Sequence, residues 1–133
     1  MSAMVRPTTE ADRRRLLADA KRVIGERYGE FGLSLTDIAE AVGCSPRQLQ
    51  RVFRSVGGTD FRSYLLSVRM ERARQLLSRG MAVRAAARRV GYKEASGLRQ
   101  RFVSYFGAVP SDFQPSPPDY DEFWRAAEDH QEK

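Results

Sequence analysis

The sequence has few of the residues on which catalytic and metal sites are commonly built. Its 133 residues include one cysteine (Cys44) and one histidine (His130). A single cysteine excludes an internal disulfide and a multi-cysteine zinc site, and one histidine cannot complete a set of metal ligands. There is also no glycine-rich phosphate-binding loop and no pair of carboxylates placed for acid–base catalysis. We therefore expect no enzyme, and we predict no metal and no cofactor.

Long apolar runs are also missing from the chain. No stretch approaches the roughly 20 apolar residues that cross a bilayer. Residues 1–15 contain no apolar run of the kind found in a secretory signal. These absences predict a cytoplasmic protein without a membrane partner.

Positive charge, by contrast, is abundant and is carried almost entirely by arginine. The formal net charge is +6, and the chain has 20 arginines against 3 lysines. Arginine pairs bidentately with guanine edges and with phosphates, although GC-rich codons alone also raise the arginine content. Residues 115–133 are proline-rich and acidic with a net charge of −4, so residues 1–114 carry about +10.

Residues 35–54 predict two helices joined by a tight turn. Thr36 can cap the first helix, and Gly43 can end it because glycine takes the left-handed conformation at little cost. Ser45 can cap the second helix, and Pro46 suits its first position, where no N–H is needed.

The second of these helices has two opposed faces. Leu49, Val52 and Phe53 make its apolar face. The opposite face is polar and mostly cationic: Arg47, Gln50, Arg51 and Arg54. Such a helix, held at a short turn, is typical of one that enters the major groove of DNA.

The pattern is repeated further along the chain. The residues that precede the turn recur 48 positions later: Ile38, Ala39, Val42 and Gly43 match Ala86, Ala87, Val90 and Gly91. The residues that follow the turn recur 49 positions later: Leu49, Phe53, Gly58 and Tyr64 match Leu98, Phe102, Gly107 and Phe113. The extra residue falls in the turn. Residues 82–106 therefore predict a second helix-turn-helix unit, and a closing helix is expected near Pro110.

Two longer helices complete the prediction. One begins after Thr8 or Thr9 and runs to about Tyr28. The other follows a cap at Asp60 and runs over about residues 61–78.

The helix at 61–78 has two apolar sectors, whereas an ordinary surface helix has one. The first sector contains Phe61, Leu65, Val68 and Leu76, and the second contains Leu66, Met70, Ala73 and Leu77. Two sectors indicate one helix shared by two cores. Arg69 and Arg72 fall within the first sector, so we expect them to be paired or to bridge between the lobes, the alternative being that they only extend to solvent.

Four blocks, DIAEAVGCSPRQLQRVFR, GTDFRSYLLSVRMERARQLL, VGYKEASGLRQRF and FGAVPSDF, resemble the AraC/XylS family of transcription regulators in their order and unequal turn lengths. The resemblance covers roughly residues 17–113. It implies an all-α fold of two homeodomain-like helix-turn-helix lobes joined by a long linker helix. Many members add a ligand-sensing domain, and this chain resembles the short standalone members.

The implied organisation has five parts: a flexible leader at 1–7, a first lobe at 8–59, a linker helix at 60–78, a second lobe at 79–114 and an acidic tail at 115–133.

The resemblance also places the DNA contacts. The base-reading residues are Arg47, Gln50 and Arg51 in the first lobe, and Ser96, Arg99 and Gln100, beside Ala95, in the second. Beside these, we expect seven side chains to contact phosphates: Thr36, Arg54, Arg62, Arg84, Arg88, Lys93 and Arg101. Each of these side chains could instead belong to a solvated surface.

The second lobe departs from the family pattern in ways that weaken it. Lys93 stands where a capping residue is common, Gly97 lies inside the recognition helix, Ala86 replaces a larger apolar residue, and Val109 replaces a Ser or Thr cap. We therefore expect the first lobe to supply most base specificity and the second lobe to supply mainly phosphate contacts.

The sequence leaves alternative roles open for Cys44 and for the C-terminal tail. Cys44 is either a methyl-accepting or redox-sensing thiol or a small half-buried filler. The tail, with Tyr120, Phe123 and Trp124, either packs on the body, contacts a partner such as RNA polymerase, or competes with DNA for the basic face.

The sequence thus predicts a monomeric, sequence-specific double-stranded DNA-binding regulator, an activator located in the cytoplasm with the nucleoid. It would place two recognition helices in successive major-groove segments about 34 Å apart. The rivals are an architectural protein that binds DNA without sequence choice, and a protein-interaction antagonist derived from the same fold.

Overall fold

Six α-helices and one 3-10 helix form the part of the chain that the computed structural model describes, residues 8–116 and Arg125. In chain order they are α1 (Glu10–Arg27), α2 (Leu35–Val42), α3 (Pro46–Ser55), α4 (Phe61–Ser78), α5 (Val83–Arg89), α6 (Ala95–Phe106) and the 3-10 helix η1 (Pro110–Phe113). The predicted leader, and the predicted tail beyond residue 116 except Arg125, lie outside the described residues.

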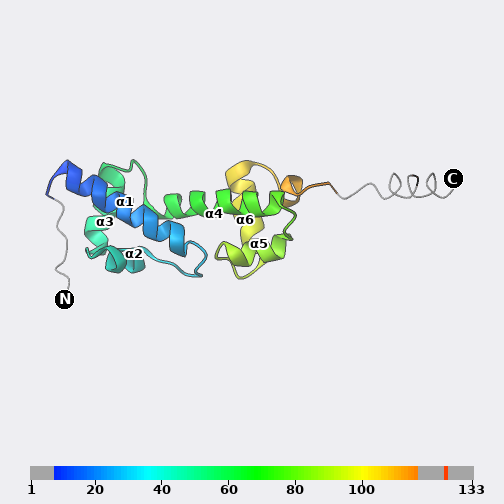
Figure 1. Cartoon of the computed structure of the whole chain (residues 1–133), viewed down its shortest axis with the longest axis horizontal. Helices are drawn as coiled ribbons and strands as arrows, with labels where there is room; N and C mark the ends of the chain where they lie inside the picture. The colour runs from blue at the N-terminus through cyan, green and yellow to red at the C-terminus, as the bar shows by residue number, and fades with distance from the viewer. Residues whose placement is uncertain (1–7, 117–124, 126–133) are drawn as a thin grey trace.

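The arrangement confirms the all-α prediction of two helix-turn-helix units on a shared helix. α1, α2 and α3 gather at the N-terminal end of α4, and α5, α6 and η1 pack around its C-terminal half (Figure 1). The turn between α2 and α3 is shorter than the turn between α5 and α6, as the change of repeat offset predicts. In the described residues no helix is both long enough and apolar enough to cross a membrane.

Side-chain caps set the start of the first four helices. The side chains of Thr9, Ser45 and Asp60 accept hydrogen bonds from backbone N–H groups three residues on, as predicted for α1, α3 and α4. Gly43 ends α2 in the left-handed conformation, with φ of 78°. The sequence therefore determines these boundaries locally.

The predicted cap of α2 is wrong by two residues. Ser34 is the cap: its Oγ accepts from the Asp37 N–H at 3.2 Å, and the Asp37 Oδ2 accepts from the Ser34 N–H at 2.9 Å. This reciprocal pair is a capping box. Its hydrogen bonds hold the pKa of Asp37 below its usual value. Thr36 lies inside the first turn, where its exposed side chain caps nothing in α2.

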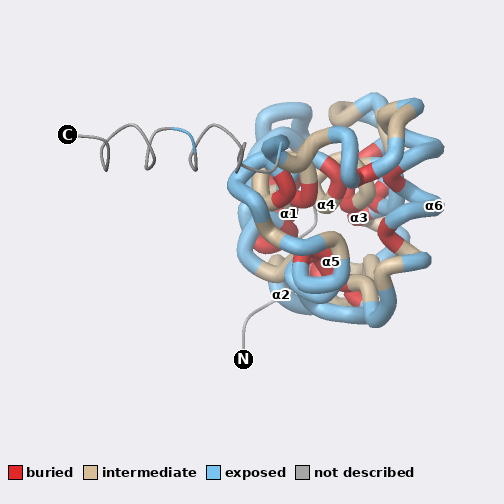
Figure 2. Tube along the Cα trace, turned by 90° about the vertical axis from the view of Figure 1, so that its right-hand side faces the viewer, coloured by how far each residue is buried: buried red, intermediate tan, exposed pale blue. Residues whose placement is uncertain are grey.

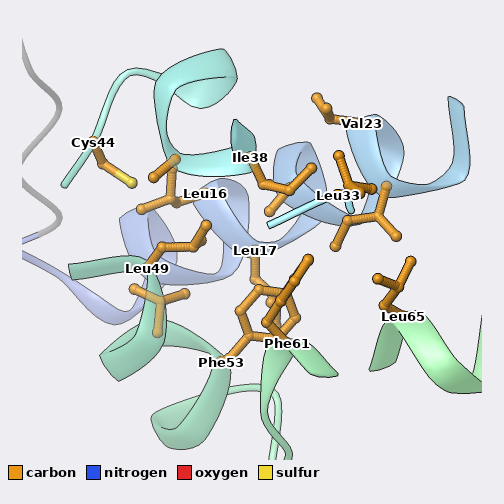
Figure 3. Packing of buried hydrophobic residues seen from close by; sticks show 14 residues of the cluster. Leu16, Leu17, Val23, Leu33, Ile38, Cys44, Leu49, Phe53, Phe61 and Leu65 are labelled. Atoms are coloured by element: carbon orange, nitrogen blue, oxygen red, sulfur yellow. The ribbon is translucent and has the colours of Figure 1, made fainter. Parts of the chain in front are cut away.

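Two separate hydrophobic clusters form the cores, and α4 contributes to both. The first cluster takes Phe61 and Leu65 from α4 and packs them against α1, α2 and α3 (Figure 3). The second takes Met70, Ala73 and Leu77 and packs them against α5 and α6. The shared-helix prediction is confirmed.

The prediction that Leu76 belongs to the first apolar sector of α4 is wrong. Leu76 packs with the second cluster although its helical angle placed it with the first. It lies near the C-terminal end of α4, where only the second lobe is within reach, so position along the helix outweighs angle. Tyr28, just after α1, packs against both clusters.

Replacing Ser34 with alanine is expected to lower the free energy of unfolding by about 1 kcal/mol, because the Asp37 N–H loses the Ser34 Oγ as its acceptor. The bond from the Ser34 N–H to the Asp37 carboxylate remains. Urea unfolding monitored by circular dichroism measures the change. The matched control is Thr36→Ala, two residues away, which is expected to change stability by less than about 0.5 kcal/mol. Equal losses in the two variants would contradict the assignment of the cap.

Candidate nucleic-acid interface

The recognition helix of the first lobe, α3, is fixed by its buried face. Leu49, Val52 and Phe53 are at most 2% exposed, and the ring of Phe53 meets Phe61 edge-on at 6.3 Å between centroids. With this face buried, Arg47, Gln50 and Arg51 are all exposed on the other side of the helix. The structure thus presents together the three residues predicted to read bases in the first lobe.

The corresponding helix of the second lobe, α6, has the same orientation but weaker local support. Leu98 and Phe102 are fully buried, and Ser96, Arg99 and Gln100 are exposed. The position before α6 is occupied by Glu94, not by Lys93 as predicted, and Glu94 makes no capping hydrogen bond. Its carboxylate instead accepts a long hydrogen bond of 3.5 Å from the Ser96 hydroxyl.

The cationic side chains predicted to contact DNA are all exposed, and none forms an ion pair with an acidic residue within residues 8–116. The ion pairs of that range involve Arg14, Arg22, Arg27 and Arg74. None involves the predicted contacts Arg47, Arg51, Arg54, Arg62, Arg84, Arg88, Lys93, Arg99 and Arg101. Arginines without an internal partner suit an external anion.

A cleft of about 890 Å³ lies between the two lobes, with α4 along one wall. Both lobes and α4 contribute predicted DNA contacts to its lining: Thr36, Gln50, Arg54, Arg62 and Arg101. Figure 2, which looks along the long axis, shows α3 and α6 toward one side of the molecule and α1 toward the other. The cleft therefore connects the two recognition helices across a cationic surface.

The acidic residue that lines this cleft is occupied structurally. Asp60 caps α4, with its Oδ1 accepting from the Ser63 N–H at 2.8 Å. That hydrogen bond, together with nearby Arg54, keeps the pKa of Asp60 below its usual value. Asp60 therefore stays charged, but four arginines line the same cleft, namely Arg54, Arg62, Arg69 and Arg101, so the cleft is electropositive.

Arg69 joins the two lobes across the same cleft. From α4, its Nε donates to the Tyr28 carbonyl at 2.9 Å and its Nη2 donates to the Glu30 carbonyl at 2.8 Å. Its guanidinium carbon lies 5.5 Å from the centroid of the Tyr92 ring in the second lobe. Burial lowers the pKa of this half-buried guanidinium.

Arg72, one turn further along α4, supports the same junction. Its Nε donates to the Tyr28 hydroxyl at 2.9 Å, and its guanidinium lies over the Tyr28 ring at 5.7 Å. The prediction that these two arginines bridge between the lobes is confirmed for Arg69, whereas Arg72 secures the first lobe to α4.

Glycines allow the turns of the two lobes to approach each other. Gly91 has φ of 96°, and a Cβ built there would lie 2.6 Å from Nη2 of Arg69. A Cβ at Gly29 would lie 2.6 Å from the Arg89 carbonyl oxygen. Neither position accepts a side chain without movement of the junction.

Sequence reasoning missed a further contact between the lobes. Lys93 Nζ lies 4.2 Å from the centroid of the Phe31 ring, and Phe31 is 64% exposed. An aromatic residue in the polar turn GEFG was the available signal. The phosphate contact predicted for Lys93 remains a prediction, and the cation–π contact is the interaction that the structure gives this residue.

Two chemical alternatives can be placed in the structure. Cys44 is 5% exposed within the first core, and burial raises the pKa of its thiol, which opposes an activated thiolate. It is more deeply buried than the predicted half-buried filler. Residues 8–116 hold no group of three or more metal-ligating side chains.

A family model described as a helix-turn-helix domain matches residues 38–116, which contain α4 and both recognition helices. The chain belongs to the AraC-type helix-turn-helix family of transcription regulators. Family membership agrees with the resemblance carried by the four sequence blocks.

Three relatives show how far the similarity extends. The transcriptional activator NphR of Rhodococcus is 33% identical over 106 residues, covering 77% of this chain and 31% of that protein. An AraC-type regulator structure from Chromobacterium violaceum superimposes with a TM-score of 0.71 at 29% identity, covering 79% and 94% of the two chains. The DNA-binding domain of AdpA, solved in complex with a target DNA, gives 0.67 at 26% identity, covering 73% and 87%.

The chain spans about a third of the length of the first curated relatives that it matches. The AraC-type similarity therefore concerns the two-lobed helical domain.

Replacing Arg69 with alanine is expected to lower the free energy of unfolding by about 2 kcal/mol, because hydrogen bonds from a charged donor are lost at a half-buried junction. Arg69→Lys should recover part of the loss, since one ammonium cannot reproduce the planar fork. Urea unfolding measures both. Arg62→Ala, the same charge change at an exposed site of α4, serves as control. A loss of stability no larger than that of the control would contradict the role of Arg69 in joining the lobes.

Gly97→Ala is expected to raise the free energy of unfolding by up to about 1 kcal/mol. A Cβ there would lie at an ordinary 3.4 Å from Tyr92 Cδ1. Gly91→Ala should act in the opposite direction, because φ is positive and Arg69 occupies the space. Thermal unfolding distinguishes the two, and destabilisation by Gly97→Ala would show that α6 packs more tightly than described.

Proposed function

We propose that the chain is a sequence-specific double-stranded DNA-binding regulator that places α3 and α6 in successive major-groove segments as a monomer. The observation that carries the proposal is the arrangement of the two recognition helices: α3 and α6 lie toward one side of the molecule, and residues of both lobes and of α4 line the cationic cleft between them. Because one chain carries two recognition helices, binding requires neither a dimer nor a palindromic site. The complex of the AdpA domain with its target DNA supports the same use of this fold.

The cleft gives the phosphates between the two groove segments a place to bind. Arg54 comes from the first lobe, Arg62 from α4 and Arg101 from the second lobe, so the backbone would be held at three points across the cleft. Phosphate contacts of this kind position the protein and make affinity salt-dependent. Most base choice would then come from Arg47, Gln50 and Arg51, each good bidentate pair discriminating by about 1–3 kcal/mol.

Selection of bound duplexes from a random pool at physiological salt tests the proposal. An enriched, asymmetric site of about two helical turns is expected. Binding without enrichment and with a steep salt dependence would instead identify an architectural protein. Failure to bind any duplex at low salt would identify the antagonist, and a stable protein partner would then be sought.

We further propose that the regulator is an activator that contacts RNA polymerase at its promoter, resident with the nucleoid in the cytoplasm. The support is the name of NphR, a transcriptional activator. Transcription in vitro from a promoter carrying the selected site should increase with added protein. A decrease would identify a repressor.

The two heads are expected to contribute unequally to base choice. Helices of the first lobe and α4 all begin with side-chain caps, whereas α5, α6 and η1 begin without one. Arg51→Ala should therefore relax sequence preference by about 1–3 kcal/mol at its base pair. Arg99→Ala should relax the preference less than Arg51→Ala does, and should mainly lower the affinity for selected and scrambled duplexes together.

Fluorescence anisotropy gives the affinity of each variant for the selected and for the scrambled duplex, and the ratio of these two affinities measures its sequence preference. Arg51 and Arg99 carry the same charge and are both exposed, so each variant is the control for the other. Equal loss of preference in the two variants would contradict the unequal division.

A further inference from the structure

The outer face of α5 carries a shallow cleft outside the interlobe surface. Its volume is about 480 Å³, and it is lined by Ala82, Arg84, Ala85, Arg88 and Arg89. Its lining is mostly apolar, although three of the five lining residues are arginines. We call this feature the α5 cleft.

The α5 cleft lacks an internal anion within residues 8–116. The ion pairs of that range use no arginine of this cleft, and all three of its arginines are exposed. Clustered cations in a mostly apolar lining repel one another, and an occupant that is both acidic and aromatic relieves that repulsion while covering apolar surface.

The chain itself contains a segment of this composition. Residues 117–133 include six acidic and two basic residues, a net charge of −4, together with Tyr120, Phe123 and Trp124. The acidic and aromatic residues are interleaved in the run DYDEFW. Charge and apolar content both complement the α5 cleft.

The segment also starts beside the α5 cleft. Gln114 Nε2 donates to the Met81 carbonyl at 2.9 Å, directly before Ala82. Pro115 Cγ lies 3.9 Å from the Cβ position of Gly80. The chain is thereby anchored at the loop that leads into α5.

We propose that the acidic aromatic segment 117–133 binds in the α5 cleft and competes with DNA for Arg84 and Arg88. Trp124 is nine residues beyond Pro115, and nine extended residues reach up to about 30 Å. A tether of this length keeps the segment at a millimolar effective concentration near the cleft. The competition with DNA rests on the proposed function, whereas the docking does not.

Docking can be measured without DNA because Trp124 is the sole tryptophan. Its fluorescence in the full chain should be blue-shifted relative to a peptide of residues 115–133. The double variant Arg84→Ala/Arg88→Ala should return the emission to that of the peptide. Circular dichroism checks that the variant keeps its helices.

A second double variant, Arg47→Ala/Arg51→Ala, removes the same charge from α3 and should leave the emission blue-shifted. Peptide-like emission in the unaltered chain, or an equal shift in both double variants, would overturn the docking.

The competition is tested with Phe123→Ala/Trp124→Ala in the full chain, which leaves the net charge unchanged. If the docked form is nine-tenths populated, freeing the cations should raise DNA affinity about tenfold. Unchanged affinity would overturn the competition. Loss of DNA binding in the unaltered chain and in every variant would instead refute the proposed function, and the fluorescence result would still decide the docking.

Discussion

The position of one lobe relative to the other depends on the guanidinium group of Arg69. The two hydrophobic cores are separate clusters, and apart from α4 only the partly buried Tyr28 packs against both within the described residues. Arg69 adds directional bonds: two to carbonyls after α1, and a cation–π contact to Tyr92. Gly91 provides the space for its guanidinium. Because the fork is planar and its hydrogen bonds are directional, these contacts restrict the rotation of one lobe relative to the other.

The lobes repeat the same architecture with unequal local support. α2 and α3 both begin in capping boxes, whereas the residues before α5 and α6, Ala82 and Glu94, provide no side-chain cap. The second lobe instead relies on aromatic packing, with Phe102, Phe106 and Phe113 in mutual contact. Packing of this kind fixes the helices against the core without fixing their first turns. A lobe built in this way suits backbone contacts, which tolerate small shifts, better than base contacts, which do not.

Much of this architecture could be predicted because local rules determine it. The repeat, the amphipathic face of α3, the caps at Thr9, Ser45 and Asp60 and the double sector of α4 all follow from residue spacing. Errors arose where two local signals competed, as between Ser34 and Thr36, or where distance along α4 mattered, as for Leu76. The cleft, the carbonyl partners of Arg69 and the Lys93–Phe31 contact depend on tertiary approach between residues far apart in sequence, which spacing does not encode.

The proposed function requires that the two recognition helices bind DNA as one rigid unit. An insertion series between the two blocks of the selected DNA site tests this most directly. About five added base pairs turn the second block by roughly half a helical turn. Affinity should then fall to that of a duplex carrying the first block alone, because the second head faces the wrong side of the helix. An affinity that does not vary with the inserted length would contradict the claim, since the lobes would then be finding their blocks independently.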